Sequence, residues 1–203
     1  MRNRKFQFYV ALIFILITLD QALKFYVKTS FVLGDGFNIL ELPWAQIKFV
    51  ENYGAAFGME LGGKLGKITL SIFRLFAGVL FLYFTYTQFK RGAKKIVLYA
   101  LVFITAGALG NIIDGIFYGV IFSDSINTVA DFLPKNGGYS TFFDGYVVDM
   151  LYFPIININW PEWIPVIGGN RFTFNNYVFN LADLAITTGA ILLVKFYSSS
   201  KLK

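Results

Sequence analysis

The stretch IVLYALVFITAGALGNII, residues 96–113, is long and apolar enough to cross a membrane as a single helix. A spanning helix needs about 20 mostly apolar residues, because each residue rises about 1.5 Å through roughly 30 Å of hydrocarbon. Residues 6–26, 68–89 and 177–197 have the same character. We therefore expect an all-α integral membrane protein, with four transmembrane helices in a single domain over residues 1–203.

The composition supports a membrane protein and excludes several common active sites. Of 203 residues, 56% are hydrophobic and 15% are charged, and the mean hydropathy is +0.59. The sequence contains neither histidine nor cysteine, which excludes Ser-His-Asp triads, Cys-His dyads, disulfides, and His- or Cys-ligated metals. Chemistry near neutral pH must then use carboxylates, Lys, Tyr, Ser, Thr, or a metal held by oxygen alone.

The basic residues predict the orientation. The segments before the first span and between the second and third, together with the end of the chain from Lys195, hold ten of the 18 Lys and Arg residues and none of the 12 acidic residues. Lys and Arg are retained on the cytoplasmic side. We therefore expect a multi-pass membrane protein with both termini cytoplasmic. No small-residue cleavage site follows the first span, so we expect it to remain uncleaved. This topology accounts for the net charge of +6 without a nucleic-acid partner.

The two remaining connections, residues 27–67 and 115–176, are too long to be turns. Residues 39–42 and 47–51 read as short strands around Pro43, which predicts a small sheet against the membrane. All three tryptophans fall in these connections, and indole rings favour the headgroup level. Residues 160–165 are expected at that interface.

Polar residues in the spans gather at one depth. The first and third spans run outward and end in polar residues, whereas the second and fourth run inward and begin with them; the seven are Asp20, Lys24, Asn111, Asp114, Arg74, Asn180 and Asp183. A charge at the bilayer centre costs at least about 2.5 to 3.5 kcal/mol on insertion scales, so each needs a reason. We expect one shared site near the outer leaflet.

Individual residues leave alternatives open. Asp20 and Lys24, one helical turn apart, are better explained as a neutralising ion pair than as a catalytic unit. Arg74 fits both a snorkelling side chain and a binding residue. Asp183 is hardest to explain structurally, because no basic residue lies nearby in sequence. Asp149 lies in an apolar run, so desolvation should raise its pKa.

Two other classes of function also carry buried polar residues. A proton-coupled transporter needs intramembrane charges, but the inner halves of the spans are almost entirely apolar and no inverted repeat is visible. A non-catalytic assembly protein could use the same residues to pair its helices.

Four blocks in order resemble those of the lipoprotein signal peptidase family, also called signal peptidase II. They are LDQALK at 19–24, VENYGAAFG at 50–58, GALGNIID at 107–114, and VVDM at 147–150 with FNLADLAI at 179–186. The resemblance extends over nearly the whole chain, from Asp20 to Ile186.

The resemblance implies an intramembrane aspartic endopeptidase that removes signal peptides from diacylglyceryl-modified bacterial prolipoproteins, cutting before the lipidated cysteine. It implies four helices with a small extracytoplasmic β-cradle, and it assigns Asp149 and Asp183 as the catalytic, water-activating pair. The substrate-binding or supporting positions are Asp20, Lys24, Asn52, Gly54, Gly110, Asn111, Asp114 and Asn180, to which we add Arg74. No metal or cofactor is expected, and the partners are the diacylated prolipoprotein and membrane lipid. The resemblance also implies a location in the bacterial cell (inner) membrane. We expect a monomer.

The chain departs from the family pattern in two ways. The family usually has an arginine after the third-block aspartate, where this chain has Gly115. Arg74 and Arg171 are both candidates for its role. The connections on either side of Asp149 are also longer than in many members, which leaves open a lid or an added outer surface.

Overall fold

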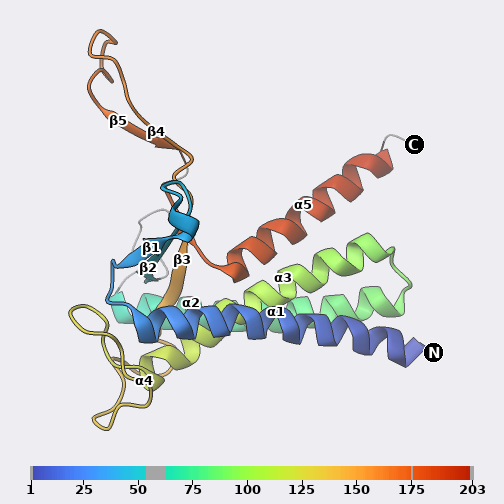
Figure 1. The fold of residues 1–203 in the computed structure, drawn as a ribbon. Coiled ribbons are helices and arrows are strands. Elements are labelled where there is room, and N and C mark those ends of the chain that lie inside the picture. The colour runs from blue at the N-terminus through green and yellow to red at the C-terminus, as the bar shows by residue number, and fades with distance from the viewer. Residues whose placement is uncertain (1, 54–62, 175, 202–203) are drawn as a thin grey trace.

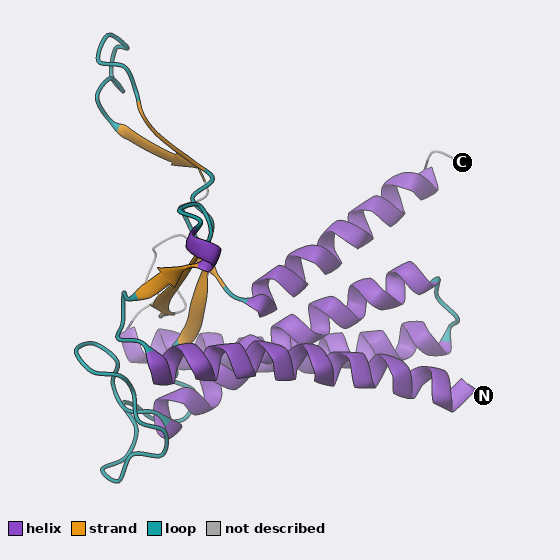
Figure 2. Ribbon diagram, viewed as in Figure 1, coloured by secondary structure: helices purple, strands orange, loops and turns teal. Residues whose placement is uncertain are grey.

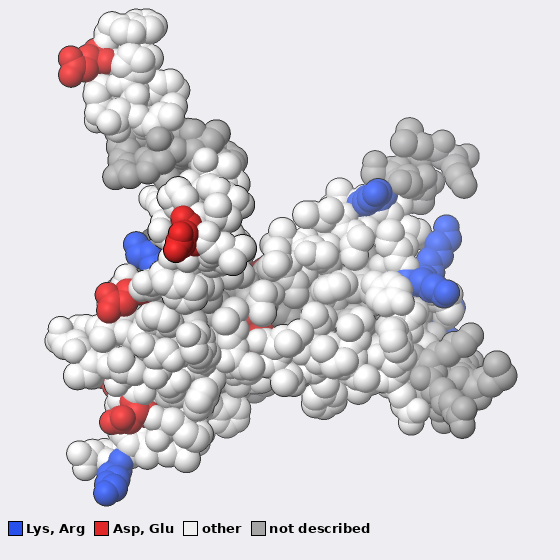
Figure 3. All heavy atoms as spheres, viewed as in Figure 1, with Lys and Arg blue, Asp and Glu red and all other residues white. Residues whose placement is uncertain are grey.

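The computed structural model describes residues 2–53, 63–174 and 176–201. Its long helices are α1 (Arg2–Ser30), α2 (Gly63–Lys90), α3 (Lys95–Ile113) and α5 (Leu181–Lys201). The N- and C-termini lie at the same end of these helices (Figure 1). In Figure 3, Lys and Arg side chains lie at that end and also at the opposite end, whereas most visible acidic side chains lie at or beyond the opposite end.

In the part of the chain that the structure describes, three helices are long and apolar enough to span a membrane: Phe6–Ser30, Ile68–Lys90 and Lys95–Ile121. They confirm three of the predicted spans. At the fourth predicted span, residues 177–197, the structure forms α5. This helix begins at Leu181, later than predicted, because residues 178–179 are drawn into a strand.

The third span is longer than predicted. Beyond Ile113 the helix continues as a π-helical turn, Asp114–Tyr118, and a short helix α4, Gly119–Ile121. The predicted span ends at Ile113, but the mostly apolar residues from Gly115 to Ile121 continue the helix. The extension carries Asp114 inside the bundle, where its side chain is fully buried.

A small antiparallel sheet lies at the end of the bundle opposite the termini (Figures 1 and 2). Its strand order is β1 (Gly36–Asn38), β2 (Gln46–Asn52), β3 (Val147–Tyr152) and β6 (Val178–Phe179). The predicted strand at residues 47–51 is confirmed as β2. The one at residues 39–42 is wrong: Ile39–Glu41 form a 3-10 turn, in which Leu40 and Glu41 have positive φ angles of 50° and 61°.

Residue alternation explains why the sheet packs on the helices. In β2, Ile47, Phe49 and Glu51 are buried and the residues between them are more exposed, as expected for a strand with one face on a core. The apolar cluster beneath this face joins the outer end of α1, the end of the third span and β3; its members include Val27, Tyr118, Phe122, Val148 and Met150.

A second, two-stranded sheet leaves the body of the protein. Strands β4 (Ile156–Asn159) and β5 (Arg171–Phe174) form a hairpin that projects away from the helices (Figure 1). Its tip contains the segment predicted to lie at the membrane interface. The side chains of Trp163 and Val166 are 81% and 97% exposed.

Glycine allows α3 to approach its neighbours closely, as the small residues of this span predicted. A Cβ atom at Gly107 would lie 2.2 Å from the carbonyl oxygen of Ala182, and one at Gly110 would lie 2.7 Å from Oδ2 of Asp20. Both distances are shorter than any real Cβ contact. Gly110 therefore lets α1, α3 and α5 meet where their polar side chains lie.

Candidate active site

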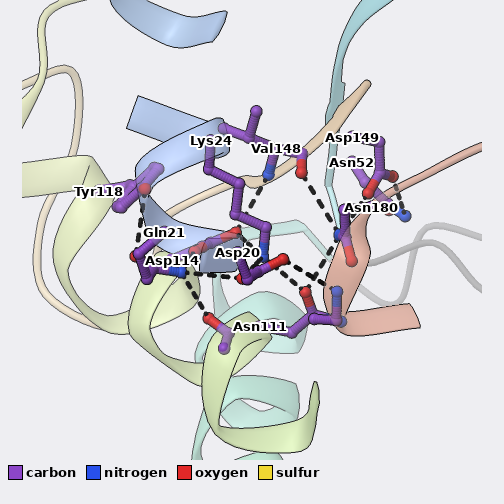
Figure 4. A network of polar contacts seen from close by, with 12 residues as sticks. Asp20, Gln21, Lys24, Asn52, Asn111, Asp114, Tyr118, Val148, Asp149 and Asn180 are labelled. Carbon is purple, nitrogen blue, oxygen red and sulfur yellow. Dashed lines mark hydrogen bonds and ion pairs between the residues drawn. The ribbon is translucent and has the colours of Figure 1, made fainter. Parts of the chain in front are cut away.

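Asp149 projects from β3 into a buried cluster of polar side chains. It lies opposite Val50 of β2 and is 3% exposed. Two amides hold its carboxyl group: Nδ2 of Asn180 donates to Oδ1 at 2.6 Å, and Nδ2 of Asn52 donates to Oδ2 at 3.3 Å (Figure 4). Both oxygens are therefore oriented by neighbouring strands and by the start of α5.

Asp183 lies in the first turn of α5. Its backbone N–H donates to Oδ1 of Asn180 at 2.8 Å, and the backbone N–H of Asn180 donates to Oδ2 of Asp183 at 3.4 Å. This reciprocal pair is a capping box with Asn180 at the N-cap. Nδ2 of Asn111 donates to Oδ1 of Asp183 at 2.8 Å, so the helix cap and α3 together fix this carboxyl group.

Asn180 connects the two aspartates. Its side chain is fully buried. Its Nδ2 donates to Asp149, to the carbonyl of Val148 at 3.3 Å and to Oδ1 of Asn111 at 3.1 Å, while its Oδ1 accepts from the backbone of Asp183. Asp149 and Asp183, which come from different elements, thus lie on either side of one side-chain amide.

The surroundings raise the pKa of Asp149 to about 7. Burial contributes most, and the negative charge of Asp183 adds to it; the hydrogen bond from Asn52, the ammonium of Lys24 and the hydrogen bond from Asn180 act in the opposite direction. This confirms the desolvation predicted from the apolar run around Asp149. The carboxyl group can therefore hold a proton near neutral pH.

Lys24 forms the centre of a second group of contacts. Its side chain is fully buried, and its Nζ lies 2.7 Å from Oδ2 of Asp114, 2.9 Å from Oδ2 of Asp20 and 2.9 Å from Oδ1 of Asn111 (Figure 4). The predicted ion pair with Asp20 is confirmed, and Asp114 shares it. All three ammonium donors are used, so Lys24 supports the site from within the protein.

Asp20 and Asp114 also hold backbone groups in place. Oδ1 of Asp20 accepts from the backbone N–H of Ala182 at 2.9 Å, and Oδ2 of Asp114 accepts from that of Val148 at 3.2 Å. These bonds attach the start of α5 and the residue before Asp149 to the same charged group. The supporting residues therefore fix both elements that carry the aspartates.

The sequence interpretation missed Gln21 as a site residue. Its Nε2 donates to Oδ1 of Asp114 at 2.8 Å, to the carbonyl of Gly110 at 3.1 Å and to Oδ2 of Asp20 at 3.2 Å, and its Oε1 accepts from the hydroxyl of Tyr118 at 3.2 Å. Gln21 stands in the LDQALK block but not on the helical stripe of Asp20 and Lys24. Its position three residues before Lys24 was the available signal.

Arg74 comes from α2 and faces the aspartates. Its guanidinium interacts electrostatically with the carboxylates of Asp183, Asp114 and Asp149. Among the residues that the structure describes, it has no carboxylate within ion-pair distance. Its charge therefore acts on the pocket without being neutralised by one partner.

Gly115 lies against α2, the helix that carries Arg74. A Cβ at this position would lie 3.2 Å from Oγ of Ser71, which stands three residues before Arg74 on α2. A side chain at position 115 would therefore point at the side of α2 that carries Ser71 and, one turn later, Arg74. Arg171 belongs to β5 on the projecting hairpin (Figure 1), and Gly54 lies outside the described residues.

Within residues 2–53, 63–174 and 176–201, no three Asp or Glu side chains are grouped as ligands for a metal ion. The carboxylates of the pocket instead contact an ammonium group, side-chain amides and backbone N–H groups.

Comparison with known proteins identifies the family. A family model described as Signal peptidase (SPase) II matches residues 12–198. The chain belongs to the signal peptidase II family. It is 47% identical to a lipoprotein signal peptidase of Porphyromonas gingivalis over 188 residues, which cover 92% of this chain and 81% of the relative. A lipoprotein signal peptidase of Amoebophilus asiaticus is 33% identical over 197 residues, with 96% and 78% covered.

Solved structures support the fold. Two structures described as a bacterial membrane enzyme each align with a TM-score of 0.59; they are 23% and 22% identical and cover 94% and 96% of this chain, and 92% and 90% of their own. Membership of the signal peptidase II family makes the chain a membrane protein of a protease family. It favours the protease interpretation over a transporter or an assembly protein.

Proposed function

We propose that this signal peptidase II homologue is an intramembrane aspartic endopeptidase that removes signal peptides from diacylglyceryl-modified bacterial prolipoproteins, cutting before the lipidated cysteine. One observation carries the proposal: Asn180 holds Asp149 and Asp183 on either side of a single amide. Relatives that cover nearly the whole chain are lipoprotein signal peptidases, which supports the choice of substrate.

The mechanism follows from the behaviour of two nearby carboxyl groups. Two carboxyls in a low-dielectric site share one proton, and the raised pKa of Asp149 makes it the partner that holds this proton. Ionised Asp183 takes a proton from a water molecule, whose oxygen attacks the scissile carbonyl carbon, while Asp149 protonates the carbonyl oxygen. The gem-diol then returns a proton to Asp149 and the C–N bond breaks as the amine takes the proton from Asp183. No metal or organic cofactor takes part.

The fold supports a four-span topology with the site near the outer leaflet. Three spanning helices, the shared end of the termini and the basic side chains at that end agree with cytoplasmic termini in the inner membrane. The four-stranded sheet would be the β-cradle beside an extended substrate peptide. The acyl chains of the substrate would stay in the bilayer, so their binding energy would help position the peptide bond. We propose a monomer as the working unit.

The decisive experiment is cleavage by the purified protein in detergent. We expect it to cut a diacylated precursor and to release a product whose new N-terminus is the lipidated cysteine. The same precursor without its diacylglyceryl group is the matched control and should remain uncut. Cleavage at another bond, or equal cleavage of both precursors, would contradict the assigned substrate.

The pH dependence of cleavage should reflect the shared proton. Because the pKa of Asp149 is raised to about 7, kcat/KM should fall as the pH rises through about 7 and the pair loses its proton. The titration belongs to the pair rather than to either carboxyl alone. Initial rates with the diacylated precursor between pH 5 and 9 measure it; a rate that keeps rising to pH 9 would exclude a protonated carboxyl as the acid.

Arg74 should bind a substrate carbonyl next to the dyad. Arg74→Ala should lower kcat/KM by about 100-fold, the usual cost of removing one charge-stabilising donor. Because position 115 lies against the side of α2 that carries Arg74, Arg74→Ala combined with Gly115→Arg should recover at least about a tenth of the lost activity, whereas Ser71→Ala should change little. If Arg74 only snorkels to headgroups, Arg74→Ala retains its kcat/KM and the second substitution restores nothing.

A further inference from the structure

A second buried ion pair lies on the opposite face of the sheet from Asp149. Lys28 of α1 is fully buried, and its Nζ donates to Oε1 of Glu51 and, at 2.9 Å, to Oγ of Ser125. Rings surround the ammonium group: its Nζ lies 4.9 Å from the centre of Tyr139, 5.5 Å from that of Phe122 and 5.7 Å from that of Phe49. None of these residues takes part in the mechanism proposed above.

Stability alone is a weak reason for such a pair. Apolar residues of similar volume usually replace a buried ion pair without loss of stability, because desolvation of the two charges offsets their attraction. Glu51 lies on the buried face of β2 together with Ile47 and Phe49, where an apolar residue would fit the core. The ion pair of Lys28 and Glu51 is therefore better explained by a role in holding part of the structure in place.

The position of Glu51 in the ladder suggests what is fixed. Glu51 pairs with Val148, while Val50 pairs with Asp149 and Asn52 with Val147. Because residues two apart in a strand share a face, Asn52 and Val50 lie on the face of Asp149, and Glu51 lies on the other. The residue that Lys28 holds is thus the direct neighbour of the residue that donates to Asp149.

The ladder that leads to this end of β2 is irregular, although Val50, Glu51 and Asn52 are all paired with β3. Between the pairs Ile47 with Leu151 and Val50 with Asp149, β2 contains one more residue than β3, which is a bulge that interrupts the regular hydrogen bonds. Beyond the bulge, the ion pair is an independent attachment of β2 to α1. Lys28 follows Lys24 by one turn of α1. One turn of this helix therefore holds β2 through Lys28, and the turn before it carries Lys24 with its contacts to Asp20, Asp114 and Asn111.

We propose that the Lys28 and Glu51 ion pair is a positioning device, which holds the end of β2 so that Asn52 donates its hydrogen bond to Oδ2 of Asp149. Lys28 and Glu51 act as positioning residues through Asn52, and they touch neither substrate nor water. The inference rests on the proposed role of Asp149. Three other charged or titratable groups interact electrostatically with the Lys28 and Glu51 ion pair: Asp124, Asp114 and Tyr139. Asp149 interacts in the same way with Asp183, Lys24 and Arg74.

The test compares Glu51→Gln, Asn52→Ala and the combined variant in the detergent assay. Without a steady bond from Asn52, which lowers the pKa of Asp149, the pKa rises. The alkaline limb of the pH profile should then move upward by about half to one pH unit, since one unit corresponds to the strength of a typical hydrogen bond. We expect kcat to fall about tenfold with KM within about twofold, because misplaced catalytic groups affect turnover more than binding. The combined variant should match Asn52→Ala alone, because residues that act through one contact are not additive.

Two further variants separate positioning from loss of folding. Lys28→Met with Glu51→Leu removes both charges, so it should fold as well as the parent and still show the shifted limb. Thr105→Val breaks a buried hydrogen bond between α3 and α2, the 3.1 Å contact with Thr85, and should lower thermal stability without moving the limb.

An unshifted limb in both Glu51 variants, or additive effects in the combined variant, would overturn the positioning role. Failure of the parent protein to cleave the diacylated precursor, or normal cleavage by Asp149→Asn, would instead reject the proposed function.

Discussion

Replacing Asp149 or Asp183 with Asn should lower cleavage of the diacylated precursor by about four orders of magnitude or more, while the protein stays folded and membrane-inserted. Each substitution removes one half of the proton exchange. Asn at 149 cannot protonate the carbonyl oxygen, and Asn at 183 cannot accept a proton from water. Because the two groups work as a unit, the double variant should be no slower than the slower single variant.

The matched control makes the same chemical change away from the pocket. Asp131→Asn alters an exposed aspartate of the loop after α4, and it should retain the parent kcat/KM. Substantial processing by either dyad variant would exclude the assignment of Asp149 and Asp183.

Stability distinguishes lost chemistry from lost folding. A carboxyl whose pKa rises from 3.8 to about 7 on folding weakens the folded state as the pH rises, because the unfolded chain ionises first. The penalty is absent below about pH 4, grows between pH 4 and 7 and is complete above 7; it amounts to at most about 4 kcal/mol. Asp149→Asn should therefore be more stable than the parent at pH 8 and not at pH 4. Thermal unfolding in detergent at both values measures this difference.

The sequence predicted those parts of the site that depend on spacing within one helix. Asp20 and Lys24 are four residues apart, so helical geometry alone places them in contact. Matching depths of polar residues in separate spans predicted that they would meet, and α1, α3 and α5 do meet there. The apolar run around Asp149 predicted its desolvation because burial follows local hydrophobicity.

Spacing within a helix and local hydrophobicity did not predict the contacts between segments that are distant in the sequence. Asn180 reaches Asp149 only because β6 pairs with β3, and no local pattern encodes which strands become neighbours. Gln21 was missed because three of its four partners lie on the third span and its extension. The 3-10 turn at residues 39–41 was taken for a strand because apolar alternation does not reveal positive φ angles.

The two arginines illustrate the same limit. Charge and position in the sequence left Arg74 and Arg171 equally acceptable as substitutes for the arginine that the family usually has at the position of Gly115. Only the packing of α2 against the end of α3, with Ser71 against Gly115, separates them. Residue type predicted the chemistry that the site needs, and tertiary structure selects the residue that can supply it.

Lys24→Met should lower the free energy of unfolding by about 3 to 5 kcal/mol, the usual cost of removing one partner from a buried charged group. The fully buried ammonium faces Asp20 and Asp114 at once, and the substitution leaves two carboxylates close together without a counter-charge. Activity should fall as well, because these carboxylates hold the backbone N–H groups of Ala182 and Val148, next to the two dyad residues. Thermal unfolding and the cleavage assay measure the two losses.

Charge removal at the partners separates electrostatics from packing. If unpaired carboxylates cause the loss, adding Asp20→Asn and Asp114→Asn to Lys24→Met should recover most of the stability, because no buried charge then lacks a partner. Lys48→Met, the same change at an exposed position of β2, should alter stability by no more than about 0.5 kcal/mol. A Lys24→Met protein that unfolds at the parent temperature would mean that water reaches the two carboxylates, which contradicts the water-excluded site that the proposed sharing of one proton by Asp149 and Asp183 requires.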